Sequence, residues 1–118
     1  RELHAKRVSY LSRLLSRNGV ITIVALISPF QSSRDYARNL IGRFVEVWVN
    51  CSVETCRMRD PKGLYKKAQE GKVSNLTGMQ DPYEPPINPE VIIDTEHEKT
   101  DVCGRKIIAA LTDLEYLD

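Results

Sequence analysis

Residues 20–27 read Val-Ile-Thr-Ile-Val-Ala-Leu-Ile, a continuous apolar run rich in β-branched side chains. Such a run fits a strand that is buried on both faces, and strands of this kind belong to parallel sheets covered by helices. Ser28-Pro29-Phe30 ends the run. The flanking sequence alternates helical and extended patterns, and this alternation indicates an α/β layer fold.

The rest of the chain supplies the other elements of that fold. The expected order is a helix over 1–18, a strand over 20–27, a helix over about 33–41, a strand over 44–49, a short helix over 53–59, a basic helical segment over 64–70, a proline-rich loop over 80–90, a strand over 91–93 and a helix over about 100–117. Right-handed crossovers would place helices on both faces of the sheet. Three strands are few for this class, and the chain begins inside a helical pattern. We therefore expect a three-layer α/β/α fold with a parallel sheet, incomplete at the N-terminus.

Apolar spacing predicts which faces of the two terminal helices turn inward. In the first helix the inward set is Leu3, Val8, Leu11, Leu14 and Leu15. In the last helix it is Val102, Ile107, Ile108, Leu111 and Leu114.

The overall composition excludes several functional classes. The 118 residues carry a net charge of +1, so no global attraction favours nucleic acid or a membrane surface. No apolar run approaches the roughly 20 residues that a membrane span needs, and no signal-like start is present. Cys51, Cys56 and Cys103 lack metal-type pairing, and we interpret them as small buried apolar residues in a reducing cytosol, with a zinc site as the alternative.

Ligands of open parallel sheets bind beyond the carboxyl ends of the strands. This rule selects Ser28 after the first expected strand, 50–52 after the second and 94–95 after the third. The Ser28 hydroxyl either meets a ligand or satisfies its own turn, and the spacing alone does not decide between the two. Arg59 follows the second strand and either pairs with Asp60 or presents its guanidinium to a nucleotide.

Residues 60–68, Asp-Pro-Lys-Gly-Leu-Tyr-Lys-Lys-Ala, form a basic segment punctuated by glycine. Such a segment suits a mobile cover over a phosphate or sulfate group, whereas composition alone favours a solvated basic helix. None of the six glycines lies in the GxxxxGK[ST] pattern that cradles nucleotide phosphates. No pair of carboxylates forms an evident acid–base couple, and neither histidine has a catalytic partner at a motif spacing.

Several motifs occur together in one order along the chain. They are Ile27-Ser28-Pro29-Phe30, Arg34 with Ala37-Arg38, Phe44-Val45-Glu46-Val47, Arg59 through Ala68, Thr77-Gly78, Asp81-Pro82-Tyr83-Glu84-Pro85-Pro86 and Asn88-Pro89-Glu90. In this order they closely resemble the adenylylsulfate kinase (APS kinase) family. The similarity runs along nearly the whole chain, and the Lys-Gly-Leu-Tyr-Lys-Lys-Ala segment with a downstream Thr-Gly is highly specific.

This resemblance implies a P-loop kinase fold that transfers the ATP γ-phosphate to the 3′-hydroxyl of adenylylsulfate, giving 3′-phosphoadenylylsulfate for sulfate activation. It implies ATP and Mg²⁺, a cytoplasmic location, and a homodimer or a fusion to ATP sulfurylase, with no nucleic-acid or membrane partner. Residues 1–118 would form the C-terminal two-thirds of one such domain, with a lid over about 60–80. The family's P-loop portion precedes Arg1, so we expect this stretch alone to be inactive. The competing hypothesis is a non-catalytic nucleotide-binding or interaction module derived from the same fold.

The resemblance also assigns roles to individual residues. The positions expected to bind adenylylsulfate are Arg1, His4, Ile27, Ser28, Lys62, Asn75 and Leu76. Ser28 also stands where the family has a phosphoserine intermediate, although direct transfer requires no such step. Arg59 is expected to contact the nucleotide, and no residue is assigned to a metal.

Two of these positions depart from the family pattern. His4 replaces an asparagine, and Leu76 replaces a phenylalanine that stacks on the substrate adenine. Leucine lacks the quadrupole of an aromatic ring. We therefore predict that Leu76 weakens adenylylsulfate binding by about 1–3 kcal/mol relative to phenylalanine.

Overall fold

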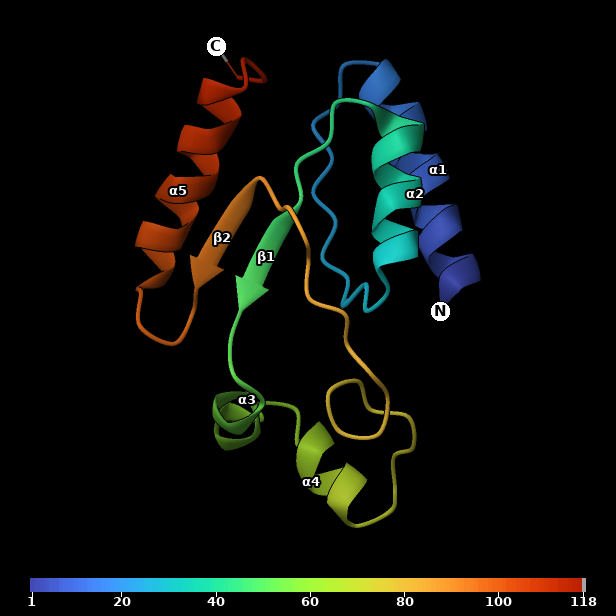
Figure 1. Ribbon diagram of the computed structural model, residues 1–118, viewed down its shortest axis with the longest axis vertical. Helices are drawn as coiled ribbons and strands as arrows, with labels where there is room; N and C mark the ends of the chain where they lie inside the picture. Colours follow the sequence, from blue (N-terminus) through green and yellow to red (C-terminus); the bar gives the residue numbers. More distant parts are fainter. Residues whose placement is uncertain (118) are drawn as a thin grey trace.

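The computed structural model describes residues 1–117. Within that range the helices are α1 (Glu2–Arg17), α2 (Gln31–Ile41), α3 (Val53–Arg59), α4 (Leu64–Gln69) and α5 (Thr100–Asp113), and the strands are β1 (Val47–Asn50) and β2 (Val91–Asp94). Figure 1 shows α1 and α2 side by side, with α5 along β2 on the far side of the strands and α3 and α4 at one end. No helix in the described part is long and apolar enough to cross a membrane.

The two strands form a parallel pair, in register from Val47 opposite Val91 to Asn50 opposite Asp94. Parallel strands need a crossover between them, and here residues 51–90, which include α3 and α4, supply it. The core lies where α5 covers β2. Its buried members are Val91, Ile93 and Cys103, with Val45, Val47, Ile107 and Ala110 packed around them. The predicted second and third strands are thereby confirmed, each shifted or extended by a few residues.

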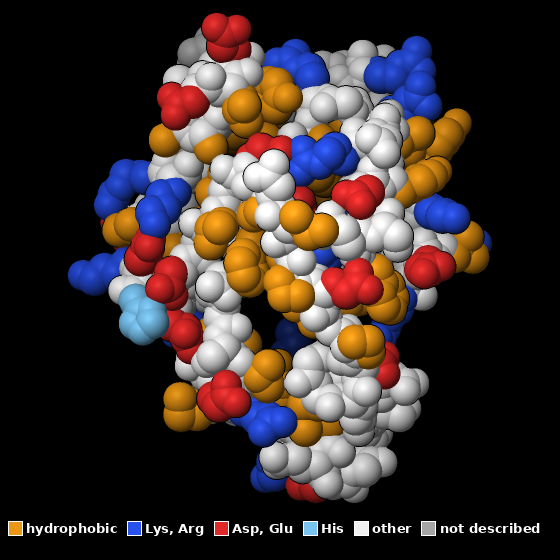
Figure 2. Space-filling view, viewed as in Figure 1, with side chains coloured by type: hydrophobic (Ala, Val, Ile, Leu, Met, Phe, Trp, Pro, Cys, Tyr) orange, Lys and Arg blue, Asp and Glu red, His pale blue; other side chains and the backbone are white. Residues whose placement is uncertain are grey.

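The prediction of a strand over residues 20–27 is wrong for the described part of the chain. The segment is irregular, and its apolar side chains are largely open, with Ile23 91% exposed. A strand exists only as a member of a hydrogen-bonded ladder. No described segment bonds to the backbone of residues 21–27. Exposed apolar side chains are common elsewhere too, as the orange atoms on one face in Figure 2 show.

Helix α1 packs on α2 through small residues, which corrects the inward face expected from leucine spacing. Ser9 and Ser12 are buried, whereas Leu3, Leu11 and Leu14 are more than half exposed. The buried positions of α1 are therefore serines, which lie on a different face from the exposed leucines. The Ser9 hydroxyl is satisfied locally, because it donates to the Ala5 carbonyl at 2.7 Å.

Helix α5 corrects its expected face in part. Ile107 packs on the core as expected, together with Cys103 and Ala110. Ile108 is 56% exposed and Leu114 is 41% exposed, so these two do not face the strands. The core-facing stripe is therefore rotated toward smaller residues, as it is in α1.

Two arginines of α2 pair with the glutamates that directly precede β1 and β2. We call these four residues the ionic network: Arg34, Arg38, Glu46 and Glu90. Arg34 Nε lies 2.8 Å from Glu46 Oε1, and both side chains are more than nine-tenths buried. This contact is an ion pair without the alignment of a hydrogen bond. Arg38 bridges Glu46 and Glu90, and Glu90 also accepts from the Glu46 amide at 2.6 Å.

The network controls the protonation of its outer carboxylate. Burial pushes the pKa of Glu90 upward, but hydrogen bonds from Arg38 and from the Glu46 amide together outweigh it and hold the pKa below the ordinary range. The hydrogen bond to Glu90 likewise raises the pKa of Arg38. Both groups are therefore charged at neutral pH.

Candidate functional site

A cavity of about 340 Å³ opens where three distant parts of the chain meet: the start of α1, the turn that follows residues 20–27, and residues 75–77. Six of the seven residues expected to bind adenylylsulfate line it, namely Arg1, His4, Ile27, Ser28, Asn75 and Leu76. The seventh, Lys62, does not. The sequence-based set therefore converges in space, although its members are separated by up to 75 positions.

Arg1 joins the start of α1 to the far wall of this cavity. One guanidinium nitrogen lies 2.5 Å from Asp81 Oδ2 and donates to the Thr77 hydroxyl at 3.2 Å. The other nitrogen donates to the Asn75 carbonyl. The pair with Asp81 is partly exposed, with the Arg1 side chain at 44%. Arg1 is thus oriented by three acceptors yet remains accessible to a ligand.

The turn at Ser28 forms the second wall and is held in an uncommon conformation. Ser28 has a φ of 42°, in the left-handed region that non-glycine residues seldom adopt. Its carbonyl accepts from Arg34 Nη1 at 2.5 Å. The Glu84 amide donates to the Pro29 carbonyl at 2.8 Å, and the Glu84 carboxylate accepts from the Gln31 amide. Helix α2 and the proline-rich loop therefore fix this turn from both sides.

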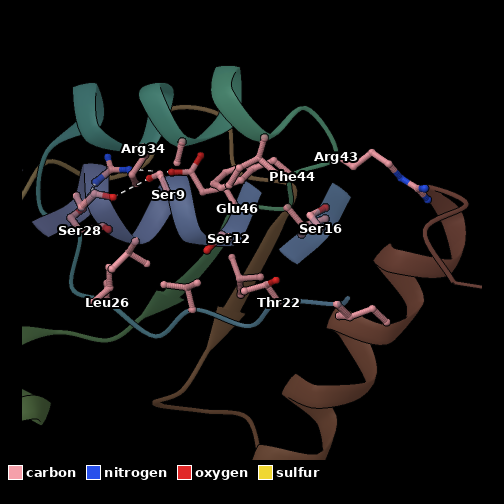
Figure 3. Close-up of a pocket in the computed structure, with 18 of the residues that line it drawn as sticks. Ser9, Ser12, Ser16, Thr22, Leu26, Ser28, Arg34, Arg43, Phe44 and Glu46 are labelled. Carbon is pink, nitrogen blue, oxygen red and sulfur yellow. Dashed lines mark hydrogen bonds and ion pairs between the residues drawn. The ribbon is translucent and has the colours of Figure 1, made fainter. Parts of the chain in front are cut away.

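A larger cavity of about 420 Å³ shares the Ser28 wall and runs between the two packed helices and residues 20–28. In Figure 3, Ser28, Arg34 and Glu46 lie toward one end, and Arg43 lies at the other. None of the other predicted substrate residues lines it. The hydroxyl of Thr22 is buried there without a hydrogen-bond partner. We place the candidate site in the smaller cavity, because the predicted residues gather there.

Residues 60–80, which the resemblance predicts to be a lid and which we call the lid segment, lie at the end of the molecule beyond β1 (Figure 1). Asp60 caps α4, because its carboxylate accepts from the Tyr65 and Lys66 amides at 3.2 and 3.1 Å. Only Ala68 of α4 is buried. Lys62 is exposed one residue before the left-handed Gly63 that begins the helix. Figure 2 shows the surface hollowed between this end and the body of the molecule.

Arg59 ends α3 and points back to the strands, not to Asp60. Its guanidinium donates to the Thr95 carbonyl at 2.8 Å, just after β2. Of the two sequence-based alternatives, the local ion pair with Asp60 is not formed, since Asp60 serves as a cap. The contact leaves the exposed Arg59 beside the carboxyl ends of both strands.

The cavity joins a cation, hydroxyl groups and apolar surface. Arg1 offers a planar donor fork that matches sulfate or phosphate oxygens. Ile27, Leu76 and Phe30 offer apolar surface for a flat ring system. Sequence reasoning missed Phe30 as a lining residue, and it missed Asp81 as a support for Arg1. Phe30 could have been predicted to line the cavity, because it follows Ser28 by two positions. The support that Asp81 gives to Arg1 could not have been predicted, because the two residues are 80 positions apart in the sequence.

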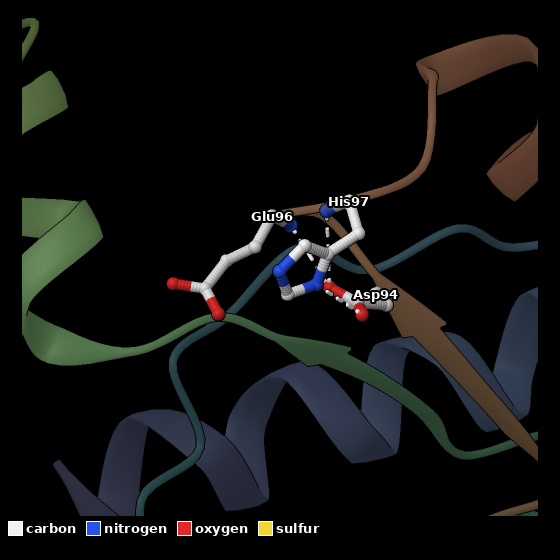
Figure 4. Close-up of side chains that lie close together, drawn as sticks. All are labelled: Asp94, Glu96 and His97. Atoms are coloured by element: carbon white, nitrogen blue, oxygen red, sulfur yellow. Dashed lines mark hydrogen bonds and ion pairs between the residues drawn. The ribbon is translucent and has the colours of Figure 1, made fainter.

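Asp94, Glu96 and His97 lie together after β2 and are the residue types that bind metal ions (Figure 4). Several of their ligand atoms bind each other or neighbouring groups: His97 Nδ1 lies 2.7 Å from Asp94 Oδ2, and Glu96 accepts from the Ser52 hydroxyl. The hydrogen bond to Asp94 raises the pKa of His97, and the same bond lowers the pKa of Asp94. Mg²⁺ prefers oxygen ligands in octahedral geometry. These three residues do not fit it, and the other described residues offer no comparable cluster.

Comparison with known proteins identifies what this chain is similar to. A family model described as adenylylsulphate kinase matches residues 1–94. The adenylyl-sulfate kinase of Rippkaea orientalis is 46% identical over 117 residues, covering 99% of this chain and 65% of that protein. A probable adenylyl-sulfate kinase of Pyrococcus abyssi is 48% identical over 117 residues, covering 99% and 67%.

The structural comparison agrees with the sequence comparison. The APS kinase of Mycobacterium tuberculosis, solved in complex with AMPPNP and APS, matches with a TM-score of 0.89 at 31% identity, covering 94% of this chain and 66% of that one. This match confirms the α/β/α fold class. The chain spans less than two thirds of the length of the first curated relatives that it matches.

Proposed function

Because the chain belongs to the adenylylsulphate kinase family, we propose that the complete protein transfers the γ-phosphate of ATP to the 3′-hydroxyl of adenylylsulfate. The product is 3′-phosphoadenylylsulfate. Residues 1–118 contribute the acceptor-substrate side of one domain and its lid. ATP is the donor, and Mg²⁺ would neutralise the transferring phosphates when bound. No step is assigned to the metal, because the described residues do not form a site for it.

One observation carries the proposal: Arg1, His4, Ile27, Ser28, Asn75 and Leu76 line a single cavity. In this proposal Arg1 pairs with the sulfate or phosphate oxygens of adenylylsulfate. Ile27 and Leu76 pack against the adenine. The Ser28 hydroxyl and His4 hydrogen-bond to the substrate.

The lid segment completes the proposal by closing over bound adenylylsulfate. Its Lys62 ammonium is an exposed cation on a short turn, so it can reach the substrate's anionic groups once the segment moves. Arg59 contacts the nucleotide from the ends of the strands. Closing such a segment would exclude water from the transfer reaction.

The experiment is a coupled kinase assay of the full-length protein with ATP, Mg²⁺ and adenylylsulfate. We expect turnover, and we expect Arg1→Ala to raise the KM for adenylylsulfate much more than the KM for ATP. Arg105→Ala is the matched control, because Arg105 is an exposed α5 arginine remote from the cavity. Equal effects on both substrates would contradict the assignment of Arg1 to the acceptor.

The competing function is a nucleotide-binding module without catalysis. Calorimetric titration of the full-length protein with adenylylsulfate separates it from the kinase. Binding together with turnover supports the kinase, whereas binding without turnover supports the module. Absence of binding to the wild-type protein would overturn both hypotheses.

A further inference from the structure

Two cysteines flank the first turn of α3. Ser52 is the N-cap of this helix: its hydroxyl accepts from the Thr55 amide at 3.2 Å, and its carbonyl accepts from the Cys56 amide at 3.0 Å. Cys51 therefore precedes the cap, and Cys56 is the fourth helical residue. In capped helices the side chains at these two positions pack against each other. Here both members of the pair are thiols.

The surroundings of the pair agree with this local geometry. Both thiols are free and half-buried, whereas Cys103 is fully buried in the core. Burial, followed by a hydrogen bond with the Cys51 thiol, raises the pKa of Cys56. Tyr65, from α4, is a neighbour of the same thiol: burial and, after it, Cys56 raise the pKa of the Tyr65 hydroxyl. Cys51 and Cys56 thus occupy neighbouring positions at the start of α3, and both are partly open to solvent.

We propose that Cys51 and Cys56 form a dithiol site that low-molecular-weight disulfides oxidise to an intramolecular disulfide. One thiolate attacks a sulfur of the small disulfide, forms a mixed disulfide and expels one small thiolate. The second cysteine thiolate then attacks the protein sulfur of that mixed disulfide and expels the other small thiolate. The two cysteines lose two electrons and two protons, and the small disulfide is reduced to two thiols.

This site is independent of the proposed kinase activity. The sequence favoured buried apolar roles for all three cysteines, and the structure keeps that role only for Cys103. The new bridge would join the end of β1 to α3.

The test uses the tryptic map of the full-length protein. Cleavage after Arg43 and Arg57 places Cys51 and Cys56 in one peptide, residues 44–57, and Cys103 falls in another, residues 100–105. The folded protein is equilibrated with a glutathione redox buffer, blocked with N-ethylmaleimide and digested. We expect peptide 44–57 to be lighter by two hydrogens and unblocked, while peptide 100–105 carries no disulfide.

A synthetic peptide of residues 44–57 is the matched reference, because it has the same spacing without the fold. We expect the ratio of disulfide to dithiol to be at least about tenfold higher in the folded protein than in the peptide. Cys51→Ser and Cys56→Ser should each leave only a mixed disulfide, and Cys103→Ser should change nothing. Equal ratios in protein and peptide, or two blocked thiols in the folded protein, would overturn the proposal.

Discussion

The two walls of the candidate cavity are held in different ways. The Ser28 turn is fixed by the ionic network, where Arg34 and Glu46 are 8% and 7% exposed. The opposite wall, residues 75–77, is tied to the body by the Arg1–Asp81 pair, whose side chains are 44% and 29% exposed. Buried charges cannot leave their partners without a large penalty, whereas exposed pairs exchange readily with water. Displacing the Ser28 wall is therefore expected to cost more free energy than displacing the wall at residues 75–77.

The largest expected effect concerns the ionic network that holds the Ser28 turn. Glu46→Gln removes the charge that neutralises the buried Arg34 guanidinium, and we expect the free energy of unfolding to fall by about 3–5 kcal/mol. Urea unfolding followed by circular dichroism measures it. Asp101→Asn is the control, because its pair with Arg105 is exposed and should contribute less than about 1 kcal/mol. Similar losses in both variants would remove the distinction between the walls.

The next effect concerns the cavity wall at residues 75–77 and the expected binding of adenylylsulfate there. Leu76→Phe should tighten adenylylsulfate binding to the full-length protein by about 1–3 kcal/mol, because an aromatic ring stacks on adenine better than leucine does. Calorimetric titration gives the dissociation constant. Ile108→Phe, at an exposed position of α5 outside the cavity, should leave it unchanged. An unchanged constant for Leu76→Phe would show that this wall does not contact the base.

A pH series examines the edge of the ionic network. The folded pKa of Glu90 lies below its unfolded value, so the carboxylate stabilises the fold above the unfolded pKa. That contribution disappears as the pH falls through the folded pKa. In wild type the free energy of unfolding should fall as the pH is lowered from neutral through the folded pKa of Glu90. In Arg38→Met this fall should be smaller, because the main hydrogen-bond donor to Glu90 is gone. If the free energy of unfolding of Arg38→Met falls as steeply with acid as that of wild type, Arg38 does not lower the pKa of Glu90.

The smallest effect on stability belongs to Arg1. Arg1→Ala should lower the free energy of unfolding by less than about 1 kcal/mol, because the Arg1–Asp81 pair is partly exposed. Amide hydrogen exchange over residues 75–81 should nevertheless speed up, since Arg1 holds the Asn75 carbonyl and the Thr77 hydroxyl. Arg17→Ala, at the other end of α1, is the control. Unchanged exchange in Arg1→Ala would mean that the wall is held by other contacts.

Local signals predicted much of this molecule. A short helix was expected over 53–59, and it forms with Ser52 as its cap, whose hydroxyl accepts from the Thr55 amide. The run before Asn50 and the run at 91–93 both form strands, because each finds the other as a hydrogen-bonding partner. Residues 20–27 carry an equally strong pattern but have no described partner, and periodicity contains no information about partners.

In the cavity, too, the residues that could be predicted from the sequence were those that belong to short motifs. Ser28 and Leu76 belong to short motifs, so a resemblance could indicate them, and they do line one cavity. Asp81 and Arg34 act through contacts with residues elsewhere in the fold, and no local rule identifies such contacts. The prediction for the buried face of α1 failed for a related reason: leucine spacing does not show which face a neighbouring part of the chain covers, and the covered positions are Ser9 and Ser12.

Residues 20–27 have a consequence for handling the protein. The segment contains no charge and no proline, is rich in β-branched residues, and has backbone groups at 21–27 without partners in residues 1–117. These are the properties of sequences that stack into cross-β fibrils. An isolated chain of these 118 residues therefore carries its own aggregation nucleus, and a lysine at Ile23, the most open position in the run, is the simplest gatekeeper against it.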